Sequence, residues 1–492
     1  MTATPVYLDH AATTPVDARV VAAMAEVLSA GLGNPASTHA SGRAAAARVA
    51  RARDQVAALI GAAAADIVFT SGATEANALA ILGHVRGQPA ERRSKGHVLA
   101  LATDHKAILG PIQRLADEGL AVTRLVPDRD GVLAAGALAA ALRPGTLLVS
   151  LVHVNSETGV AQDLPALAAV CRERGVALHV DAAQSAGKLP LDVQGIDYLS
   201  LTAHKFGGPQ GVGALYVAPA RRVTLQAQQV GGGQERGLRA GTLPTHQIVG
   251  MGLACELASS GRDALAAHLE LLRQRLWQGL ADLPGVLPNG HVQQRAPGIL
   301  NLSFEDVEGE SLLAGLPELA VATGSACNSS SGEPSYVLRA LGRDTQLAQA
   351  SLRLSLGANS TEQDVDTAIA ALRRELARLR ALSPRLPPPV ADWQARGWRV
   401  VQGEAGERRL GTWLRLLLAV DADQVVAARF QAYGCPHTLA ACRALVAVLP
   451  GQGRSTPRGS PADWLAQSGA PTDKLGRMLL LEDALQAALS AW

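Results

Sequence analysis

Five hydrophobic runs in the first half of this 492-residue chain are each followed by polar side chains that could do chemistry. The runs are DIVFT (66–70), HVLALAT (97–103), TLLVSLVHV (146–154), VALHVD (176–181) and IDYLSLT (196–202). The polar residues that follow or end them are Ser71 and Thr74, Asp104 and His105, Asn155, Asp181 and Gln184, and Thr202, His204 and Lys205. Any one set could be ordinary loop polarity, but five sets at corresponding positions predict a shared site.

Three of these features together meet the needs of one cofactor. Lys205 is one of five lysines in the chain, and a lysine at the end of a buried run could form a Schiff base with an aldehyde. Asp181 could keep a pyridine nitrogen protonated, as the ring requires to accept electrons. The helix start in SGATEANALAILG could bind a phosphate, although a plain helix cap by Ser71 or Thr74 is the ordinary alternative. The combination predicts a pyridoxal-phosphate enzyme.

The elements that must position these residues alternate along the chain from about residue 40 to 260. The five runs are continuous rather than alternating, which is typical of strands covered by helices on both faces. Helical patterns such as SGRAAAARVARARDQVAALIG and LPALAAVCRERG lie among them. This order predicts an α/β fold with a mostly parallel sheet, whose ligands bind beyond the carboxyl ends of the strands.

Further parts are predicted beyond this sheet. About 15–260 forms the large domain, and 261–381 with the N-terminal segment forms a smaller α+β domain, so that 1–381 is one enzyme unit. Four prolines in SPRLPPPVADW predict a stiff linker over 382–392. Residues 393–492 are expected to form a third, small α+β domain, with strands in LGTWLRLLLAVD and VVAARFQAYG and a helix beginning near Cys435.

The composition is that of a protein with ample core and little charge bias. Hydrophobic residues make up 48% of the chain, and the formal net charge of +2 gives no reason to expect binding to nucleic acid or a membrane surface. Five cysteines, an odd number in so long a chain, argue against a disulfide framework. No run approaches the roughly 18 apolar residues of a membrane span, and the N-terminus has no signal-peptide pattern. We therefore expect a cytoplasmic protein.

The first three quarters of the chain closely resemble the cysteine desulfurases, pyridoxal-phosphate enzymes that take sulfur from cysteine. The resemblance runs from YLDHAATTP to LRLSLGANSTEQDVD and includes FTSGATEANALA, HVNSETGV, HVDAAQSAGKLP, AHKFGGPQGVGALYV, GGGQERGLRAGTLP and GSACNSSSGEPSYVLRALG. It implies a fold type I pyridoxal-phosphate enzyme, like aspartate aminotransferase, that converts L-cysteine to L-alanine.

The resemblance also implies roles at the cofactor. Lys205 would hold it covalently, and Asp181 would pair with its ring nitrogen. Gln184 would bond the ring hydroxyl, and His105 would stack on the ring and move protons. Four residues would hold the phosphate: Ala73, Thr74, Thr202 and His204.

Three further residues receive roles from the same resemblance. Thr242 would reach the phosphate of a neighbouring subunit, which implies a homodimer. Asn155 would border both cofactor and substrate. Arg353 would bind the substrate carboxylate, because its planar guanidinium matches a carboxylate with two hydrogen bonds, although an ordinary surface ion pair is the alternative.

Cys327 is expected to be the nucleophile. It lies between Gly324 and Gly332 among small polar residues with little to anchor them to a core, which suits a thiol that visits a cofactor and then passes sulfur on. The resemblance implies that Cys327 carries the sulfur as a persulfide. Cys171 and Cys255 lie in apolar helical patterns and are expected to be small buried hydrophobes.

The last hundred residues have a fainter resemblance to the scaffold proteins on which iron–sulfur clusters are assembled. RFQAYGCPHTLAACRALV and LLLEDALQAAL carry it, and Cys435 matches one of three ligand cysteines. The other two are missing, because Leu410-Gly411-Thr412 stands at one position and Arg477 at the other. A [2Fe–2S] cluster ordinarily needs four ligands, so we expect no stable metal site, with Cys327 or Cys435 at most a transient ligand.

Alternatives stay open for both parts. In the tail, Cys435 either accepts sulfur from Cys327 or belongs to a docking or structural module. In the main body, the alternative is a selenocysteine lyase or another class V lyase or aminotransferase. The expected partners are L-cysteine, a second copy of the chain, and an iron–sulfur scaffold or other protein that accepts sulfur.

Overall fold

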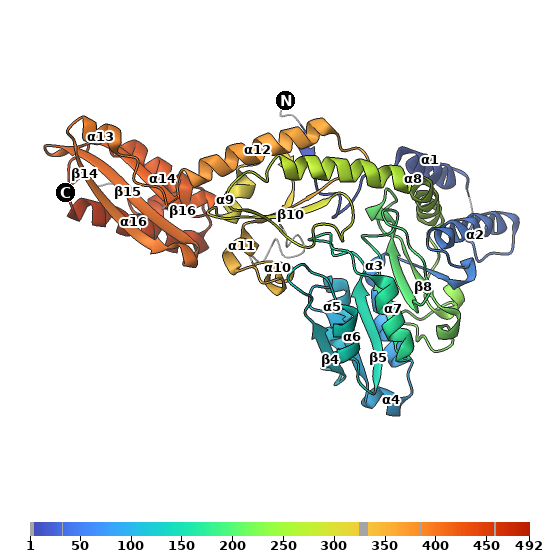
Figure 1. Ribbon diagram of the computed structural model, residues 1–492. Coiled ribbons are helices and arrows are strands. Elements are labelled where there is room, and N and C mark those ends of the chain that lie inside the picture. Colours follow the sequence, from blue (N-terminus) through green and yellow to red (C-terminus); the bar gives the residue numbers. More distant parts are fainter. Residues whose placement is uncertain (1–3, 32, 324–332, 384, 457–458) are drawn as a thin grey trace.

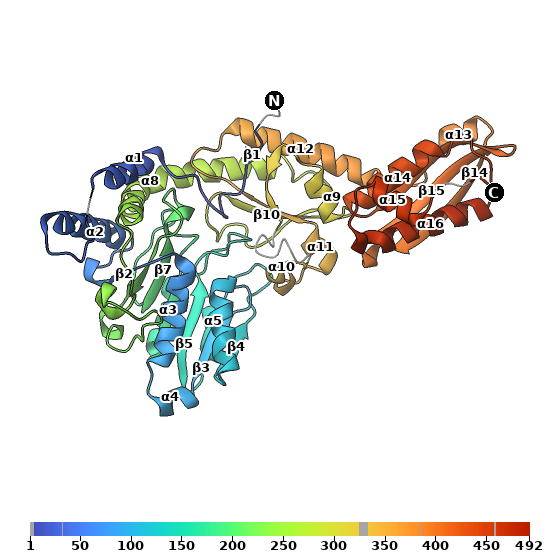
Figure 2. The same ribbon diagram turned by 180° about the vertical axis from the view of Figure 1, so that it is seen from behind.

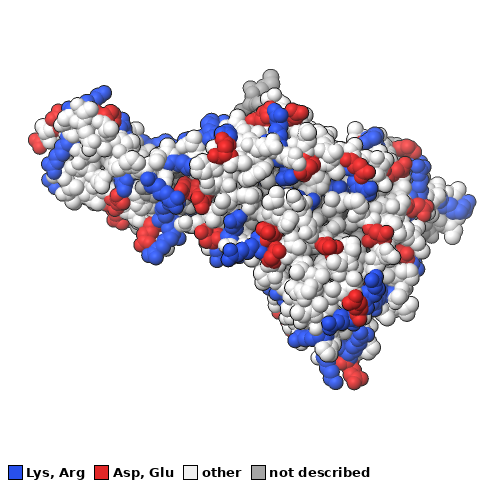
Figure 3. Space-filling view, in the orientation of Figure 1, with Lys and Arg blue, Asp and Glu red and all other residues white. Residues whose placement is uncertain are grey.

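The computed structural model describes residues 4–31, 33–323, 333–383, 385–456 and 459–492. We use "large domain" for residues 15–260, "small domain" for 261–381 with segment 4–14, and "tail" for 393–492. In both views of Figures 1 and 2 the tail lies on the far side of the small domain from the large domain. Basic and acidic side chains of the described residues are interspersed over the face shown in Figure 3, as the small net charge predicts. In the described part of the chain, no helix is both long and apolar enough to cross a membrane.

A seven-stranded sheet forms the centre of the large domain, in the order β2–β8–β7–β6–β5–β3–β4. Its neighbours pair in parallel except β8, which is antiparallel to β2 and β7. The strands are β2 (Ile67–Thr70), β3 (His97–Leu101), β4 (Ala121–Leu125), β5 (Thr146–Val152), β6 (Ala177–Asp181), β7 (Tyr198–Thr202) and β8 (Gly213–Val217). The five predicted runs are confirmed as β2, β3, β5, β6 and β7, and the predicted sheet is confirmed as mostly parallel.

Helices cover both faces of this sheet. The helices of the large domain, of which α8 continues beyond it, are α1 (Ala18–Ser29), α2 (Ala40–Leu59), α3 (Ala73–Arg86), α4 (Ala90–Ser94), α5 (Lys106–Asp117), α6 (Ala135–Ala141), α7 (Leu164–Glu173) and α8 (Thr245–Gln278). Consecutive residues of β2 lie in different apolar clusters, Val68 in one and Phe69 in the other, because successive side chains point to opposite faces. Both faces are therefore buried, which explains why the strands are continuously hydrophobic.

The small domain is built on a four-stranded antiparallel sheet in the order β12–β13–β10–β9. Helix α8 spans 34 residues and runs from the large domain into this domain (Figure 1). The N-terminal β1 (Val6–Tyr7) pairs in parallel with β11 (Leu319–Ala320), so the start of the chain belongs beside this sheet. The other elements are β9 (Val286–Pro288), β10 (Ile299–Phe304), α9 (Gly309–Ala314), β12 (Ala322–Thr323), α10 (Tyr336–Ala340), α11 (Thr345–Gln349), β13 (Ser351–Ser355) and α12 (Glu362–Arg380).

The tail contains a three-stranded antiparallel sheet in the order β14–β15–β16. The predicted strands are confirmed as β15 (Thr412–Asp421) and β16 (Gln424–Tyr433), and the predicted helix as α14 (Pro436–Val448), which Cys435 precedes as N-cap. The remaining elements are α13 (Ala391–Ala395), β14 (Arg399–Glu407), α15 (Pro461–Gln467) and α16 (Leu475–Ser490). The proline-rich segment lies against β16, where Gln431 Nε2 donates to the carbonyls of Ser383 (3.3 Å) and Leu386 (3.2 Å).

The tail and the small domain share a packed joint. One cluster of buried apolar side chains includes Leu312 and Leu376 of the small domain together with Leu439 of the tail. Asp306 pairs with Arg385 (2.9 Å) and Arg408 (2.7 Å). This combination of apolar and ionic contacts fixes the tail against α9 and its neighbours.

A buried ion pair fastens the loop before α8 to the sheet. Glu235 is 7% exposed, and its carboxylate accepts two hydrogen bonds from Arg53 of α2 (2.5 and 2.7 Å) and one from the Phe69 N–H of β2 (2.7 Å). Glu235 and Arg236 adopt positive φ angles of 48° and 59°, which non-glycine residues adopt only when surrounding contacts compensate. The three hydrogen bonds to Glu235 supply that compensation.

Replacing Glu235 with glutamine should destabilise the protein, because Arg53 would keep a buried charge without its partner. Breaking a buried pair in this way costs about 3–5 kcal/mol, so the midpoint of thermal unfolding should fall by several degrees. Glu407→Gln is the matched control, because Glu407 pairs with Arg409 on the surface and should change the midpoint little. Equal midpoints for Glu235→Gln and Glu407→Gln, measured by circular dichroism, would contradict the structural role of Glu235.

Candidate active site

A cavity of about 560 Å³ lies at the carboxyl ends of β5, β6 and β7, where the sequence predicts the site. The N-terminal segment closes one side of it through Ala11 and Ala12. Nine residues predicted for the site line this cavity: Ala73, Thr74, His105, Asp181, Gln184, Thr202, His204, Lys205 and Arg353. Their convergence follows from the fold, because the carboxyl ends of parallel strands meet at one edge of the sheet.

The start of α3 forms one wall of the cavity. Helix α3 begins at Ala73, and its N-cap Gly72 has no side chain to satisfy the first amide groups of the helix. Such amides carry a partial positive charge and bind anions. Glu75 lies in the same turn, and its carboxylate is paired with Arg239 (2.9 Å), so it does not cancel this charge. The wall can therefore hold a phosphate.

Asp181 ends β6 and is 5% exposed. Asn77 of α3 donates to its Oδ2 (2.7 Å), and the Ala183 N–H donates to its Oδ1 (2.9 Å). These two hydrogen bonds fix the orientation of the carboxylate that faces the cavity. Sequence reasoning missed Asn77, although an asparagine among the apolar residues of the helix pattern TEANALAILG is itself a signal of a buried polar contact.

Lys205 ends a short 3₁₀ turn, Ala203–Lys205, that directly follows β7. Its Nζ donates to the carbonyls of Ala11 (2.6 Å) and Ala12 (2.7 Å). Gln184 Nε2 also donates to the Ala11 carbonyl (2.7 Å). The amine that sequence reasoning singled out is therefore held inside the cavity, against the backbone of the N-terminal segment.

Burial governs the ionisation of the groups around Lys205. It lowers the pKa of His204 to about 4, so the imidazole is neutral at physiological pH. A second amine, Lys188, is 8% exposed and donates to Gln184 Oε1 (3.5 Å). Burial, together with the charges of Lys205 and Arg353, lowers the pKa of Lys188 to about 7. Sequence reasoning assigned no role to Lys188. The turn after β6 brings this residue close to Lys205, and the sequence alone does not show that proximity.

His105 is the N-cap of α5, and its Nδ1 accepts the Ala107 N–H (3.1 Å). In the neutral ring this contact places the proton on Nε2. Asp104 lies beside it, fully buried, and accepts the N–H groups of Leu101 (2.7 Å) and Val152 (2.8 Å). Burial raises the pKa of Asp104 to about 8. His105 is thus a cavity residue, whereas Asp104 ties β3 to β5 behind it.

Of the predicted residues that the structure describes, three do not line the cavity. Asn155 is buried, and its side chain shapes the turn that follows β5 by donating to the Thr103 carbonyl (2.9 Å) and accepting the Glu157 N–H (2.9 Å). Thr242 is exposed. Cys435 lies in the tail, fully buried. Cys327 falls outside the described residues.

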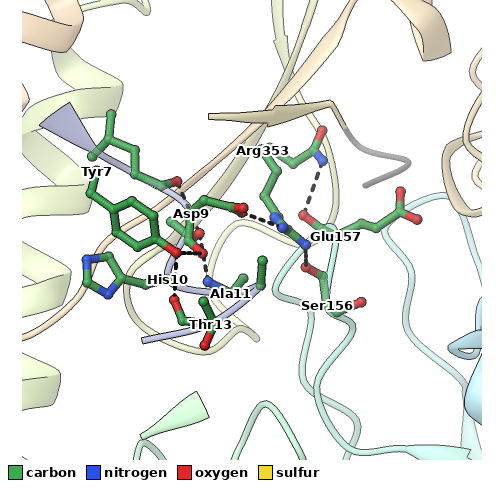
Figure 4. A network of polar contacts seen from close by, with 12 residues as sticks. Tyr7, Asp9, His10, Ala11, Thr13, Ser156, Glu157 and Arg353 are labelled. Atoms are coloured by element: carbon green, nitrogen blue, oxygen red, sulfur yellow. Dashed lines mark hydrogen bonds and ion pairs between the residues drawn. The ribbon is translucent and has the colours of Figure 1, made fainter. Parts of the chain in front are cut away.

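Arg353 reaches the cavity from β13 of the small domain and is the centre of a polar network (Figure 4). Its terminal nitrogens donate to Asp9 Oδ1 (2.6 Å) and to the Ser156 carbonyl (2.9 Å). Glu157 lies next to Ser156 and accepts a hydrogen bond from Ser335 (2.5 Å). Burial raises the pKa of Glu157 to about 7, although Ser335 and the charges of Arg353 and His105 oppose the rise.

Comparison with known proteins decides the family. The model of the class V aminotransferase family matches residues 6–368. Proteins named cysteine desulfurase IscS from Pectobacterium carotovorum subsp. carotovorum and Salmonella schwarzengrund are 50% and 49% identical over 385 residues, which make up 77% of this chain and 95% of each relative. The chain belongs to the cysteine desulfurases of the class V aminotransferase family.

Solved structures of similar proteins agree with this desulfurase fold. A NifS-like protein superposes with a TM-score of 0.70 at 33% identity, over 76% of this chain and 99% of its own. DndA from Streptomyces lividans superposes with a TM-score of 0.61 at 39% identity, over 71% of this chain and 99% of its own. The predicted fold type I architecture is confirmed.

Cysteine desulfurases are pyridoxal-phosphate enzymes, and the cavity fits that cofactor. It offers the Lys205 amine to the aldehyde, the Asp181 carboxylate to the ring nitrogen and the start of α3 to the phosphate. The predicted cofactor is confirmed by the family. The predicted small buried cysteines are confirmed as well, because Cys171 and Cys255 are 1% and 0% exposed.

The tail of this desulfurase matches the model of a second family. The model of the NifU-like N-terminal domain matches residues 386–492, as the fainter resemblance predicted. At two of the three positions where the resemblance predicts ligand cysteines, the chain has Leu410, which is 76% exposed, and Arg477. In the described part of the chain, no group of three His, Cys, Asp or Glu side chains is placed to hold a metal ion together.

Glu157→Gln should change how the stability of the protein depends on pH. Because burial raises the folded-state pKa from 4.5 to about 7, the folded protein binds a proton that the unfolded chain has lost between these values. The native protein therefore loses stability as pH rises through this window, by about 3 kcal/mol in total, and the loss is complete above about pH 7. Glutamine cannot ionise, so the variant should gain stability relative to the native protein from pH 5 to 7. If the curves of unfolding midpoint against pH for Glu157→Gln and the native protein were parallel, they would contradict this expectation. Glu173→Gln is the control, because Glu173 is exposed and its curve should run parallel to that of the native protein.

Proposed function

We propose that this desulfurase converts L-cysteine to L-alanine, with Lys205 holding pyridoxal phosphate and Cys327 taking the sulfur as a persulfide. The observation that carries the proposal is that Lys205 Nζ, the Asp181 carboxylate and the start of α3 border one cavity. An amine, an anionic partner for a pyridine nitrogen and an anion cradle are the three groups that this cofactor requires.

The cofactor would be held as follows. Lys205 would bond its aldehyde carbon, Asp181 would accept the hydrogen bond of its protonated ring nitrogen, and Gln184 would bind its ring hydroxyl. The phosphate would lie against Ala73, Thr74, Thr202 and His204. When bound, the ring supplies an electron sink for bonds that break at the substrate. Thr242 is exposed at the surface of the single chain, which supports its assignment to the phosphate of a second copy and hence a homodimer.

The remaining roles belong to residues that act on the substrate. Arg353 would bind its carboxylate, and Asn155 would support this end of the site through the turn that contains Ser156. Lys205 Nζ and His105 Nε2 would move protons. The Cys327 thiolate would attack the substrate sulfur, forming an S–S bond as the C–S bond breaks, and the electron pair left on carbon would take a proton to give alanine.

The variants Lys205→Ala and Cys327→Ala separate two steps of this proposal. Lys205→Ala should lose the visible absorption of the lysine-bound cofactor and its fixation by borohydride. Cys327→Ala should keep that absorption but should produce no alanine from cysteine, because the acceptor of the sulfur is gone. Sulfide and alanine are measured after cysteine and a reductant are supplied. Cys171→Ala is the control, and it should keep both the cofactor absorption and the production of alanine. Full turnover by Cys327→Ala would remove Cys327 from the mechanism.

A selenocysteine lyase or another class V lyase or aminotransferase is the alternative function. An aminotransferase would release a keto acid from its substrate and would not need Cys327. Comparing the rates with cysteine and selenocysteine, and assaying for pyruvate beside alanine, separates these activities on the same protein.

For the tail we propose a docking module that is fixed to its own enzyme, rather than a sulfur acceptor. Cys435 is 0% exposed, and the carbonyl of its neighbour Gly434 accepts a hydrogen bond from Ser311 Oγ of α9 (2.7 Å). The only hydrogen bond of Cys435 Sγ among the described residues runs to Thr438 Oγ1 (3.4 Å). A thiol so enclosed cannot meet a persulfide unless the joint opens. The physiological acceptor would then be a separate iron–sulfur scaffold or other sulfur-accepting protein.

The accessibility of Cys435 tests this assignment. A maleimide should not label Cys435 in the native protein but should label it in Asp306→Arg, because a third cation beside Arg385 and Arg408 would open the joint. Asp421→Arg, an exposed substitution elsewhere in the tail, should leave Cys435 protected. Mass spectrometry after incubation with cysteine provides the functional test. Sulfur on Cys435 that depends on Cys327 would establish the relay instead.

We further propose a division into a desulfurase unit over 1–381, a linker over 382–392 and a scaffold-like unit over 393–492, located in the cytoplasm. The separate family matches over 6–368 and 386–492 support this division. The four described cysteines, Cys171, Cys255, Cys435 and Cys442, are free thiols, which supports a reducing compartment.

A further inference from the structure

The N-terminal segment is fastened to β13 close to Arg353. The Ser355 N–H donates to the Leu8 carbonyl (2.7 Å), and the Ala11 N–H donates to Ser355 Oγ (2.9 Å). Asp9 lies between these contacts and forms a parallel bridge with Ser355. The backbone of Asp9 is therefore fixed two residues from Arg353 on the neighbouring strand.

The side chain of Asp9 is the counter-charge of a buried guanidinium. Arg353 is 4% exposed, and its side chain forms an ion pair with Asp9 at 2.6 Å. Figure 4 shows Asp9 and Ser156 approaching the guanidinium from two different chain segments. A buried cation without a partner is strongly unfavourable, so Asp9 both neutralises Arg353 and fixes its orientation.

The pair still leaves hydrogen-bonding capacity for a ligand. Arg353 carries five N–H donors, and the hydrogen bonds to Asp9 and to the Ser156 carbonyl use one on each terminal nitrogen. A second N–H therefore remains on each terminal nitrogen. Because Arg353 lines the cavity, these donors are a place for a ligand acceptor.

The charges at this end of the cavity limit what can bind there. Arg353 and Asp9 together carry no net charge, and Glu157 is a further carboxyl group close enough for Arg353 to lower its pKa. A ligand carboxylate on Arg353 adds one negative charge beside Asp9. A second acidic group on the same ligand would lie near the carboxyl groups of Asp9 and Glu157, and repulsion between like charges is strong where little water screens it.

We propose that Asp9 is a specificity-determining residue that holds Arg353 in place and, by its charge, restricts this end of the site to amino acids with one carboxylate. Cysteine and alanine belong to this class, and amino acids with an acidic side chain are disfavoured. The inference rests on the proposed function, in which Arg353 binds the substrate carboxylate. Asp9 acts through Arg353 and is a positioning residue in that respect.

Three substitutions separate the charge of Asp9 from its role as a tether. Asp9→Asn keeps the shape and an acceptor oxygen for Arg353 but removes the charge. Asp9→Glu keeps the charge, and Asp9→Ala removes both. Asp17→Asn is the matched control, because Asp17 lies further along the same N-terminal segment and pairs with Arg19 (2.7 Å) rather than with the cavity.

The measurement is the dissociation constant of the holoenzyme for L-alanine and for L-aspartate, obtained by isothermal titration calorimetry. Asp9→Asn should lower the ratio of the aspartate constant to the alanine constant at least tenfold. Asp9→Glu and Asp17→Asn should keep the native ratio. Asp9→Ala should weaken alanine binding at least tenfold, because Arg353 loses its orientation.

The outcomes distinguish this inference from the proposed function. Arg353→Gln should weaken alanine binding, and unchanged binding would overturn the role of Asp9 together with that of Arg353. An unchanged ratio in Asp9→Asn would overturn the specificity role alone, even if the enzyme desulfurates cysteine and keeps its lysine-bound cofactor. If the native protein showed no desulfurase activity, this result would instead contradict the proposed function.

Discussion

The site depends on one segment, residues 8–14, that is hydrogen-bonded to both domains of the enzyme. On the small-domain side, the Ser355 N–H donates to the Leu8 carbonyl. On the large-domain side, Lys205 Nζ and Gln184 Nε2 both donate to the Ala11 carbonyl. The amine and Arg353 come from different domains, so their separation is set by this shared backbone rather than by either sheet alone. A displacement of the segment would move two parts of the site together. These are Ala11 and Ala12, which close one side of the cavity, and Asp9, which pairs with Arg353.

Burial, more than direct charge pairing, sets the ionisation of the groups around this segment. It lowers the pKa of His204 to about 4 and of Lys188 to about 7, and it raises the pKa of Glu157 to about 7. His204 is therefore neutral at physiological pH, whereas Lys188 and Glu157 change charge close to it. The Asp181 carboxylate is oriented by two hydrogen-bond donors in the same surroundings. The cavity therefore combines groups whose charge depends on burial with a carboxylate whose position is fixed by hydrogen bonds.

Much of the large domain and most of the predicted cavity could be predicted from the sequence because the signals are local. A continuous apolar run followed by a polar residue marks both a buried strand and the edge where ligands bind. Contacts between distant positions left no such signal. Asp9 and Arg353 are 344 positions apart, and Glu157 meets Ser335 across 178 positions. Strand β8 was missed as well, and one of its two neighbours, β2, is far away in sequence, whereas the other, β7, directly precedes it in the chain.

The tail matches the model of the NifU-like N-terminal domain, although two of the three cysteines that the resemblance predicts are absent from it. Ligand residues stabilise a scaffold only when all of them converge on one ion, so a partial set contributes little. Here Leu410 is 76% exposed and Cys435 is completely buried, so two of the three positions that the resemblance assigns to ligands lie in opposite environments. Packing governs the buried position, because Gly434 bonds to Ser311 and one apolar cluster continues from the small domain into the tail. A change at Cys435 should therefore affect this joint first, because the segment around Cys435 attaches one domain to the other.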